Sequence, residues 1–334
     1  MPNETRIADI VEPEVFAPYI MERSLNQNRF FQAGVIENSQ QISNLLAGGG
    51  RIFTLPYWKD LTGSTDVPSE TDETAINNIS SDKMLARRQI REKAWGANDL
   101  SAAIAGSDPY AAIGERVSGF WAKADENALL YTLRGVFAGN VKDNSSDLVV
   151  DISVASGTDT TSANKISAKK SIEAVMKMGD AFNEIVAVAV HSVVYQTLIE
   201  NDLIDYIADS EGKLTIPTYM GLRLIVSDNL PVITGSGIAT KYHSYFFKSG
   251  AVGYGQNSGG AIIPVEVARK PGIGGGTDVL YTRKQFALHP LGFSWEMASD
   301  TGITPTDANL MHEDSWNRVY EKKNTGVVAV ISNG

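Results

Sequence analysis

Residues 108–139 read DPYAAIGERVSGFWAKADENALLYTLRGVFAG, and this stretch decides the fold because its pattern predicts one long helix. Asp108 suits the N-cap and Pro109 the first helical position, whereas Gly139 and Asn140 tolerate the left-handed backbone that closes a helix. Apolar side chains recur at spacings of three and four residues, at Ile113, Val117, Phe120, Ala124, Ala128 and Tyr131. A helix of this length would be a rod of roughly 45 Å.

The apolar stripe widens after Leu129, so the C-terminal half of the helix should be buried on several sides. Phe120 and Leu133 lie on the stripe and are predicted to be buried, whereas the acidic pair Asp125-Glu126 is predicted to lie on a solvated face. The stretch by itself also suits a core helix of an α/β enzyme, and this alternative stays open at this point.

Composition sets wide limits on the protein. The chain has 334 residues, enough for about two domains of ~150 residues each, and contains no cysteine for disulfides or thiolate metal sites. We find neither the apolar core of a signal peptide nor a run of ~18 apolar residues, and we expect a soluble protein kept in a cytoplasm. The net charge of −10 argues against the broad basic surface of a nucleic-acid binder.

Residues 1–47 are mostly polar, with isolated apolar pairs such as Phe30-Phe31. A segment of this kind suits an arm laid over another surface better than a self-contained domain. The alternative is a frayed N-terminal extension.

Residues 48–98 resemble a long excursion with two arms. Gly48–Gly50 form a flexible joint, and the run RIFTLPYW from Arg51 to Trp58 predicts a strand that Pro56 restricts to a sheet edge. The tip and the return arm carry opposite charges, with acids Asp66, Glu70, Asp72 and Glu73 and bases Lys83, Arg87, Arg88, Arg91 and Lys93. A compact monomer has little use for an excursion of ~50 residues, so we expect a partner to cover it.

The charge pattern leads to a hypothesis of contact between subunits. The tip acids would meet basic residues of a neighbouring subunit, and the alternative is a solvated loop kept acidic for solubility. The contact candidates are Phe30, Phe31, Tyr57, Trp58, Asp66, Glu70, Asp72, Glu73, Arg87, Arg88 and Arg91.

An α/β unit follows the long helix. The pattern predicts a helix over Ile166–Met178, a buried strand over Glu184–Val190, a helix over Val193–Glu200 and a strand over Leu222–Val226. From Ser244 onward short strands separated by glycine-rich turns predominate.

A search for catalytic motifs finds no positive case for an enzyme. There is no Walker-type phosphate loop, no Gly-x-Ser-x-Gly elbow, and no pair of histidines at metal-ligand spacing. We therefore expect no metal and no cofactor. The alternative of a soluble α/β hydrolase or sugar-acting enzyme would need an active site of carboxylates far apart in the sequence.

Several runs resemble major capsid (coat) proteins of tailed bacteriophages. The runs HSVVYQTLIENDLIDYI from His191 and IPTYMGLRLIVSDNLP up to Pro231 carry the strongest resemblance. Others follow in the order that the family requires, namely LLYTLRGVFA from Leu129, FFKSGAVGYG from Phe246, QFALHPLGFSW from Gln285 and WNRVYEKKN from Trp316. The first ~100 residues match the family in the order of their segments more than in their amino-acid sequence.

The resemblance implies the Hong Kong 97-type phage capsid fold, an α+β subunit. Its parts would be an N-terminal arm (1–47), an extended E-loop (48–98), a peripheral domain with a long spine helix (99–142), an axial domain (143–243), return strands of the peripheral domain (244–304) and a C-terminal segment (305–334).

The same resemblance implies a structural function, in which hexamers and pentamers form an icosahedral shell that encloses double-stranded DNA. A virion assembled in the host bacterial cytoplasm would contain the protein, with a portal and a decoration protein as partners. The chain lacks a long helical extension before the arm, so we expect a separate scaffolding protein. Cargo-enclosing bacterial compartments share the fold and are the nearest alternative.

Overall fold

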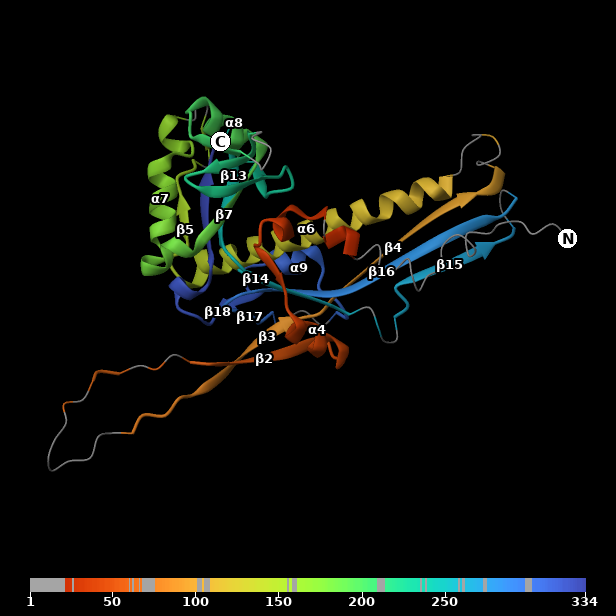
Figure 1. Cartoon of the computed structure of the whole chain (residues 1–334), viewed down its shortest axis with the longest axis horizontal. Helices are drawn as coiled ribbons and strands as arrows, with labels where there is room; N and C mark the ends of the chain where they lie inside the picture. Colours follow the sequence, from red (N-terminus) through yellow and green to blue (C-terminus); the bar gives the residue numbers. More distant parts are fainter. Residues whose placement is uncertain are drawn as a thin grey trace.

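The structure is a computed structural model that describes residues 22–25, 27–59, 61, 63–65, 67, 76–100, 104, 109–154, 156–157, 161–208, 214–234, 236–237, 239–257, 259, 262–272, 275–297 and 302–334. The subunit is elongated, with helix α6 (Pro109–Asp143) running through its middle (Figure 1). A rounded α/β domain lies at one end of α6, and a long sheet runs beside the other half of the helix (Figure 1). A thin hairpin projects from the body in the direction opposite to that sheet (Figure 1).

Helix α6 confirms the predicted long helix, but its C-terminal end differs from the prediction. The helix continues through Gly139 and Asn140 and ends at Asp143, giving 35 residues. The predicted N-cap, Asp108, lies outside the described residues.

The glycines near the end of α6 allow another part of the chain to approach the helix closely. A Cβ atom at Gly135 would stand 2.1 Å from the carbonyl oxygen of Leu310, and one at Gly139 would stand 2.7 Å from that of Trp316. No side chain fits at such distances, so these positions serve packing against the C-terminal segment rather than helix termination.

The two halves of α6 differ in burial. The C-terminal half is surrounded, as the widening stripe predicted, with exposed fractions of 3% or less at Leu129, Leu130, Leu133, Val136 and Phe137. In the N-terminal half the prediction for Phe120 is wrong, because 39% of this residue is exposed. Here the helix covers one face of a sheet, where Val117 and Trp121 pack on Val265 and Leu280.

This difference predicts unequal effects of truncation. We expect Leu133→Ala to lower the free energy of unfolding by about 2–5 kcal/mol, because a fully buried side chain leaves a cavity. The matched change Phe120→Ala should cost less than about 2 kcal/mol, because that ring already contacts water. Urea unfolding of the purified subunits measures both, and a loss at Phe120 equal to that at Leu133 would contradict the assigned burial.

The long sheet along α6 has β16 as its central strand. Its order is β1-β14-β16-β15, and β4 also pairs with β16. The strands are β1 (Ile36–Asn38), β14 (Val252–Asn257), β16 (Thr277–Pro290), β15 (Val265–Lys270) and β4 (Gln89–Asn98). Trp121 of α6 donates from Nε1 to Thr282 Oγ1 of β16 at 3.2 Å, which fixes the helix on the sheet.

A second sheet forms the rounded domain, with the order β5-β19-β13-β7-β10-β9-β8 and β11 paired with β13. The strands are β5 (Val149–Asp151), β19 (Val327–Ser332), β13 (Thr240–Lys248), β7 (Ile185–Val190), β10 (Leu222–Val226), β9 (Leu214–Tyr219), β8 (Ile204–Ala208) and β11 (Val232–Thr234). Helices α7 (Ala168–Met176) and α8 (Ser192–Glu200) belong to the same domain.

The predicted α/β unit is confirmed within this domain. The apolar run 184–190 becomes β7, which lies between β10 and β13, so both of its edges are hydrogen-bonded. The pairing of β7 with β10 is parallel, with Val188 opposite Leu224. A continuous apolar run is what a strand buried in the middle of a sheet requires.

The N-terminal segment that the structure describes packs on the subunit's own body. Helix α3 (Arg29–Gln32) precedes β1, and α4 (Gln40–Ala47) lies on β14. The close approach of α4 depends on Gly255, where a Cβ atom would stand 2.5 Å from Ile42 Cγ2.

The remaining elements are short. They are β2 (Ile52–Trp58), β3 (Ser81–Arg87), β6 (Ser156–Gly157), β12 (Ser236–Gly237), β17 (Phe293–Trp295), β18 (Trp316–Arg318), α9 (Asp307–Met311) and three 3-10 helices at Ser162–Asn164, Gly179–Glu184 and Lys322–Asn324.

Candidate assembly surfaces

The hairpin formed by β2 and β3 projects from the body of the subunit (Figure 1). Its root is fastened to the body, because alternate residues of the two strands, Phe53 and Leu55 on β2 and Met84 on β3, join a small core with Ile42 and Leu46. Among the described residues β2 pairs with β3 and with no other strand, which confirms the edge strand that Pro56 predicted.

Beyond this root the hairpin presents apolar side chains to water. The exposed fractions are 66% at Trp58, 77% at Leu61, 91% at Ile76 and 50% at Ile79. Apolar side chains gathered on a projecting element are typical of a surface that another protein covers.

A pocket of about 750 Å³ lies where the hairpin passes the C-terminal segment. Trp58 and Leu61 line it from the hairpin side, and Tyr320 and Glu321 line it from the body side. Tyr57 is half-buried and packs edge-on against Tyr320 with ring centroids 5.0 Å apart. Of the two predicted contact residues Tyr57 and Trp58, Trp58 is therefore the one whose side chain is mostly exposed.

The predicted contact residues of the N-terminal segment lie inside or against the subunit's own core. Phe30 is fully buried with its ring edge-on to Phe247, at 5.9 Å between centroids. Phe31 is half-buried and packs edge-on against Tyr254 at 5.1 Å. The prediction of a contact role for Phe30 is therefore corrected, because a side chain without exposed surface has none to offer a neighbour.

The acids of the hairpin tip, Asp66, Glu70, Asp72 and Glu73, lie outside the described residues. Their predicted contact with a neighbouring subunit stays a prediction.

The three arginines of the return arm are engaged within their own subunit. Arg87 is 2% exposed and donates to the carbonyl oxygen of Gly302 at 2.7 Å. Arg88 donates to Gln285 Oε1 at 3.3 Å, and Arg91 pairs with Asp307 at 3.0 Å.

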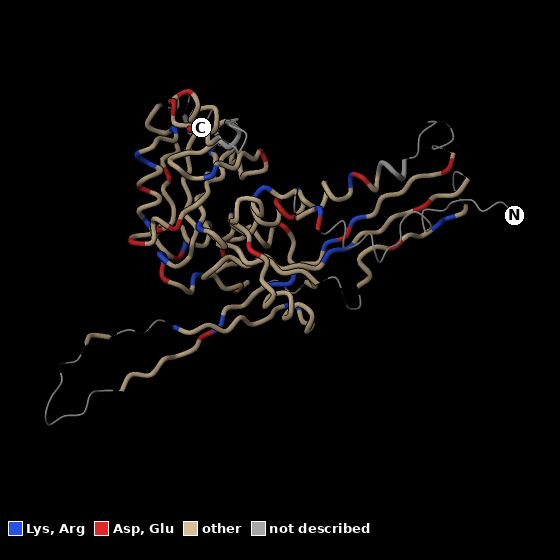
Figure 2. The backbone as a smooth tube through the Cα atoms, viewed as in Figure 1, with Lys and Arg blue, Asp and Glu red and all other residues tan. Residues whose placement is uncertain are grey.

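The hypothesis that these arginines pair with acids of a neighbouring subunit is corrected for Arg87, whose side chain is buried. Arg88 and Arg91 are partly buried and already have partners within their own subunit. The exposed cations of the same strands are Lys83 on β3 and Lys93 on β4. Figure 2 shows that basic and acidic residues both occur on these strands and that both kinds are scattered over the rest of the subunit.

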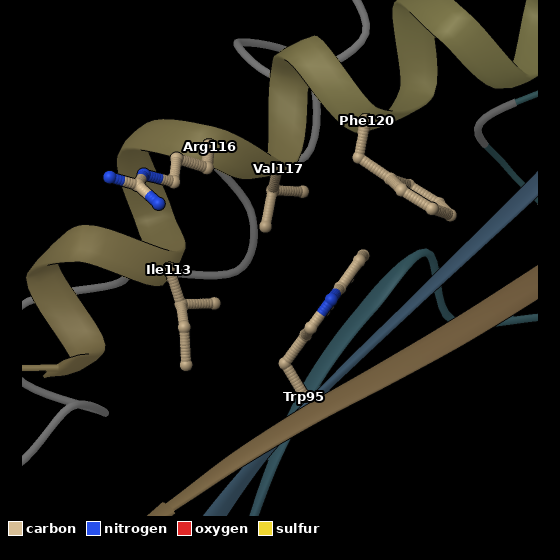
Figure 3. Close-up of a pocket in the computed structure, with 5 residues that line it drawn as sticks. All are labelled: Trp95, Ile113, Arg116, Val117 and Phe120. Atoms are coloured by element: carbon tan, nitrogen blue, oxygen red, sulfur yellow. The ribbon is translucent and has the colours of Figure 1, made fainter.

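A second apolar surface lies between α6 and β4, far from the hairpin. Trp95 of β4 and Ile113, Arg116, Val117 and Phe120 of α6 line a groove of about 210 Å³ (Figure 3). The Phe120 ring stands edge-on to Trp95 with centroids 5.1 Å apart. This groove explains the exposure of Phe120, because the ring forms one wall of it.

The acidic pair in the middle of α6 is buried, which corrects the predicted solvated face. Asp125 and Glu126 are 1% and 8% exposed. Asp125 pairs with Lys284 of β16 at 2.5 Å, and the Lys284 side chain is itself 3% exposed. Burial raises the pKa of Asp125, and Lys284 opposes this change.

The neighbouring carboxylate points to the other domain. Glu126 accepts hydrogen bonds from the Ser227 hydroxyl and, at 3.1 Å, from Asn229 Nδ2, in the turn after β10. Asp125 therefore fastens α6 to the long sheet, and Glu126 fastens it to the second sheet. Both carboxylates hold structural contacts rather than facing a common cleft.

Neither a cluster of metal ligands nor a membrane-spanning helix occurs among the described residues. No three residues among the described histidines, aspartates and glutamates gather closely enough to hold a metal ion. None of the described helices is long and apolar enough to cross a membrane.

Comparison with known proteins gives concordant matches. Residues 110–328 match the family described as Gp13-like, "Major capsid protein 13-like". The chain is 35% identical over 327 residues to the major capsid protein of Bacillus phage SPP1, covering 97% of this chain and 97% of that protein.

Solved structures with a similar fold include the capsid of Ralstonia phage GP4, with a TM-score of 0.61, 10% identity, and 92% and 91% of the two chains covered. The capsid of cyanophage Pam1 has a TM-score of 0.55, 11% identity, and 92% of each chain covered. At these identities the likeness is one of fold.

Proposed function

The chain belongs to the Gp13-like family of major capsid proteins, and from this premise we propose that its copies assemble as hexamers and pentamers into an icosahedral shell enclosing double-stranded DNA. The protein is a structural component of a tailed-phage capsid, and its place is the virion. The expected Hong Kong 97-type α+β fold is confirmed. The enzyme alternative is dropped, because the family consists of capsid proteins.

One structural observation supports assembly most directly. The hairpin leaves Trp58 and Leu61 largely in water beside a pocket of about 750 Å³, a surface that a lone subunit has no means to cover. Many such contacts of modest size sum to a stable lattice when each subunit meets several neighbours.

Electron microscopy of the protein co-expressed with its neighbouring genes tests the proposal. Closed shells of uniform size are the expected result. A discrete small oligomer with a ligand-filled cleft would contradict it, and particles filled with a cargo protein would favour the related bacterial compartments.

The finer partners follow from the same proposal. They are a separate scaffolding protein, a portal and a decoration protein, with assembly in the host bacterial cytoplasm. The net charge of −10 suits a shell that encloses DNA without binding it tightly through a basic surface. In this proposal residues 48–98 act as the E-loop, α6 as the spine helix of the peripheral domain, and residues 143–243 as most of the axial domain.

The contact proposed for the hairpin tip gives a test by charge reversal. The triple change Glu70→Lys, Asp72→Lys and Glu73→Lys should slow or abolish assembly, with Lys83 and Lys93 of a neighbour as the exposed partners. The thermal unfolding of the subunit should stay nearly unchanged, because each exposed ion pair is worth only ~0–1 kcal/mol. Sedimentation across a salt series measures the assembled fraction, which should fall for wild type as salt screens the contact over ~10 Å at 0.1 M.

The neutral triple change Glu70→Gln, Asp72→Asn and Glu73→Gln is the matched control. It removes the attraction without adding repulsion, so it should lie between wild type and the lysine variant. Equal assembly of all three proteins at every salt concentration would remove the electrostatic role and leave the loop as a spacer.

A further inference from the structure

Arginines at the base of the hairpin converge on one short piece of chain, residues 302–305. Arg87, the last residue of β3, donates to the carbonyl oxygens of Gly302 at 2.7 Å and Ile303 at 3.2 Å. It also donates to the carbonyl oxygen of Arg51 at 2.9 Å, which ties the beginning of β2 to the end of β3. Arg51 in turn donates to the Gly302 carbonyl oxygen at 3.3 Å.

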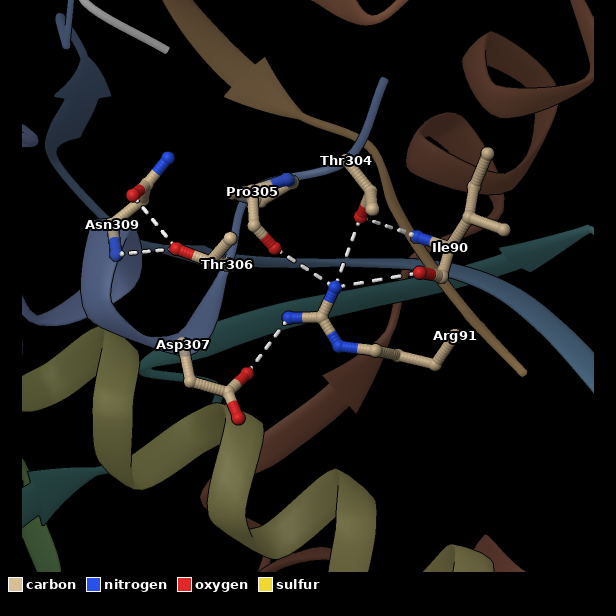
Figure 4. A network of polar contacts seen from close by, with 7 residues as sticks. All are labelled: Ile90, Arg91, Thr304, Pro305, Thr306, Asp307 and Asn309. Carbon is tan, nitrogen blue, oxygen red and sulfur yellow. Dashed lines mark hydrogen bonds and ion pairs between the residues drawn. The ribbon is translucent and has the colours of Figure 1, made fainter. Parts of the chain in front are cut away.

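Arg91 on the neighbouring strand β4 continues this set of contacts (Figure 4). Its guanidinium donates to Thr304 Oγ1 at 3.0 Å and to the carbonyl oxygen of Pro305 at 2.9 Å, and it pairs with Asp307 at 3.0 Å. The backbone N–H of Ile90 also donates to Thr304 Oγ1, at 3.0 Å. A planar guanidinium with several donors is suited to hold many acceptors in one fixed arrangement.

The segment held by these arginines leads directly into a helix packed on α6. Thr306 caps α9 by accepting from the Asn309 N–H at 3.1 Å (Figure 4). Leu310 of α9 is fully buried, and its carbonyl oxygen lies where a Cβ atom at Gly135 of α6 would be 2.1 Å away. Contacts therefore run without a break from the hairpin base through residues 302–305 and α9 to α6.

The length of the hairpin amplifies any change at its base. The seven residues of β2 span about 23 Å, so a rotation of about 10° at Arg51 would move Trp58 by about 4 Å. Such a displacement exceeds the range over which a hydrogen bond or a packed contact survives. A surface that must meet a neighbour in one position therefore needs a rigid base.

We propose that Arg87 and Arg91 are positioning residues that set the direction of the hairpin relative to α6 and, through it, the curvature at which subunits join. This inference rests on the proposed assembly into a shell. Residues 302–305 and α9 connect the two elements, and the arginines hold that connection through side-chain contacts far apart in the sequence.

Hydrogen exchange on the soluble subunit and electron microscopy of assembled particles test the proposal together. In Arg91→Gln, the amides of β2 and β3 should exchange at least ten-fold faster, while those of β7 and β13 keep their wild-type rates. Assembled particles should change from one size to a mixture of sizes and open sheets. Arg87→Lys keeps the charge but loses the planar fork, and it should show the same two effects.

Lys270→Gln is the matched control, because Lys270 lies at the end of β15 in the same sheet as Arg91 and its side chain is exposed. It should behave as wild type in both measurements. If Arg87→Lys fails to fold, Arg91→Gln decides, because its side chain lies partly at the surface.

Unchanged exchange in the hairpin of Arg91→Gln would overturn the proposal, and so would faster exchange accompanied by particles of uniform wild-type size. Failure of the wild-type protein to form any particle would instead overturn the proposed function, while the exchange rates of β2 and β3 would still report on the anchoring of the hairpin.

Discussion

Acidification from pH 7 to pH 4 is expected to lower the free energy of unfolding of the subunit by about 3 kcal/mol for each of two buried histidines. Burial lowers the pKa of His243, on β13, to about 4, and also lowers that of His289, on β16, to about 4. For His243, nearby Arg134 adds to the effect and Asp151 opposes it. Among the described residues, neither ring has a hydrogen-bond partner.

The sign follows from proton binding in the two states. An unfolded histidine takes up a proton below about pH 6.5, whereas the folded state keeps both imidazoles neutral down to about pH 4. The unfolded state therefore binds more protons in this window, and the stability present above pH 6.5 is lost as the pH falls. Asp125 acts in the opposite direction, because burial raises its pKa.

Urea unfolding at pH 7 and pH 4 measures the effect, and leucine variants isolate it from the carboxylates. His243→Leu and His289→Leu should each reduce the difference in unfolding free energy between the two pH values by about 3 kcal/mol, and the double variant should reduce it by about 6 kcal/mol. A double variant with the same pH dependence as wild type would show that these rings are not kept neutral by burial.

The second large effect is expected at the buried ion pair between α6 and β16. Lys284→Met should lower the free energy of unfolding by about 3–5 kcal/mol, because it leaves the Asp125 carboxylate buried without its cation. Lys284 also lies over the rings of Tyr254 and Phe286, at 5.6 and 5.7 Å from the centroids, so a methionine of similar length keeps the apolar contacts.

A second variant separates the cost of a stranded charge from the loss of packing. Asp125→Leu combined with Lys284→Met should recover most of the lost unfolding free energy or make the subunit more stable than wild type, because burying an apolar pair carries no cost of removing charges from water. Arg283→Ala, at a more exposed neighbouring position, should cost less than about 1 kcal/mol. A double variant no more stable than Lys284→Met would show that the destabilisation by Lys284→Met does not come from the unpaired charge of Asp125.

Several elements were predictable from sequence because local patterns determine them. Helix α6 follows from its apolar spacing and its length, and β7 follows from a continuous apolar run. The edge character of β2 follows from Pro56, which has no backbone N–H to donate. The family resemblance rested on runs spread over ~200 residues, and the comparisons confirmed it.

One buried group carried a local signal that the interpretation of the sequence missed. Asp125 follows Val117 and Trp121 at steps of four and precedes Leu129 by four, so it stands on the buried stripe of α6. A charged side chain is ordinarily expected at the surface, because burying a charge is costly unless the charge is paired. The partner that makes its burial tolerable, Lys284, lies 159 residues away.

The sequence by itself determined which segments form helices and strands, which faces are apolar, and to which family the chain belongs. Only the tertiary structure decided where those faces meet. In the folded subunit Gly139 does not end the helix but lets the backbone at Trp316 approach it closely. Phe120 is exposed at a groove, and Arg87 is hydrogen-bonded within its own subunit. The physical reason is that burial and pairing depend on groups brought together by folding, whereas periodicity reports only the order of residues along one element.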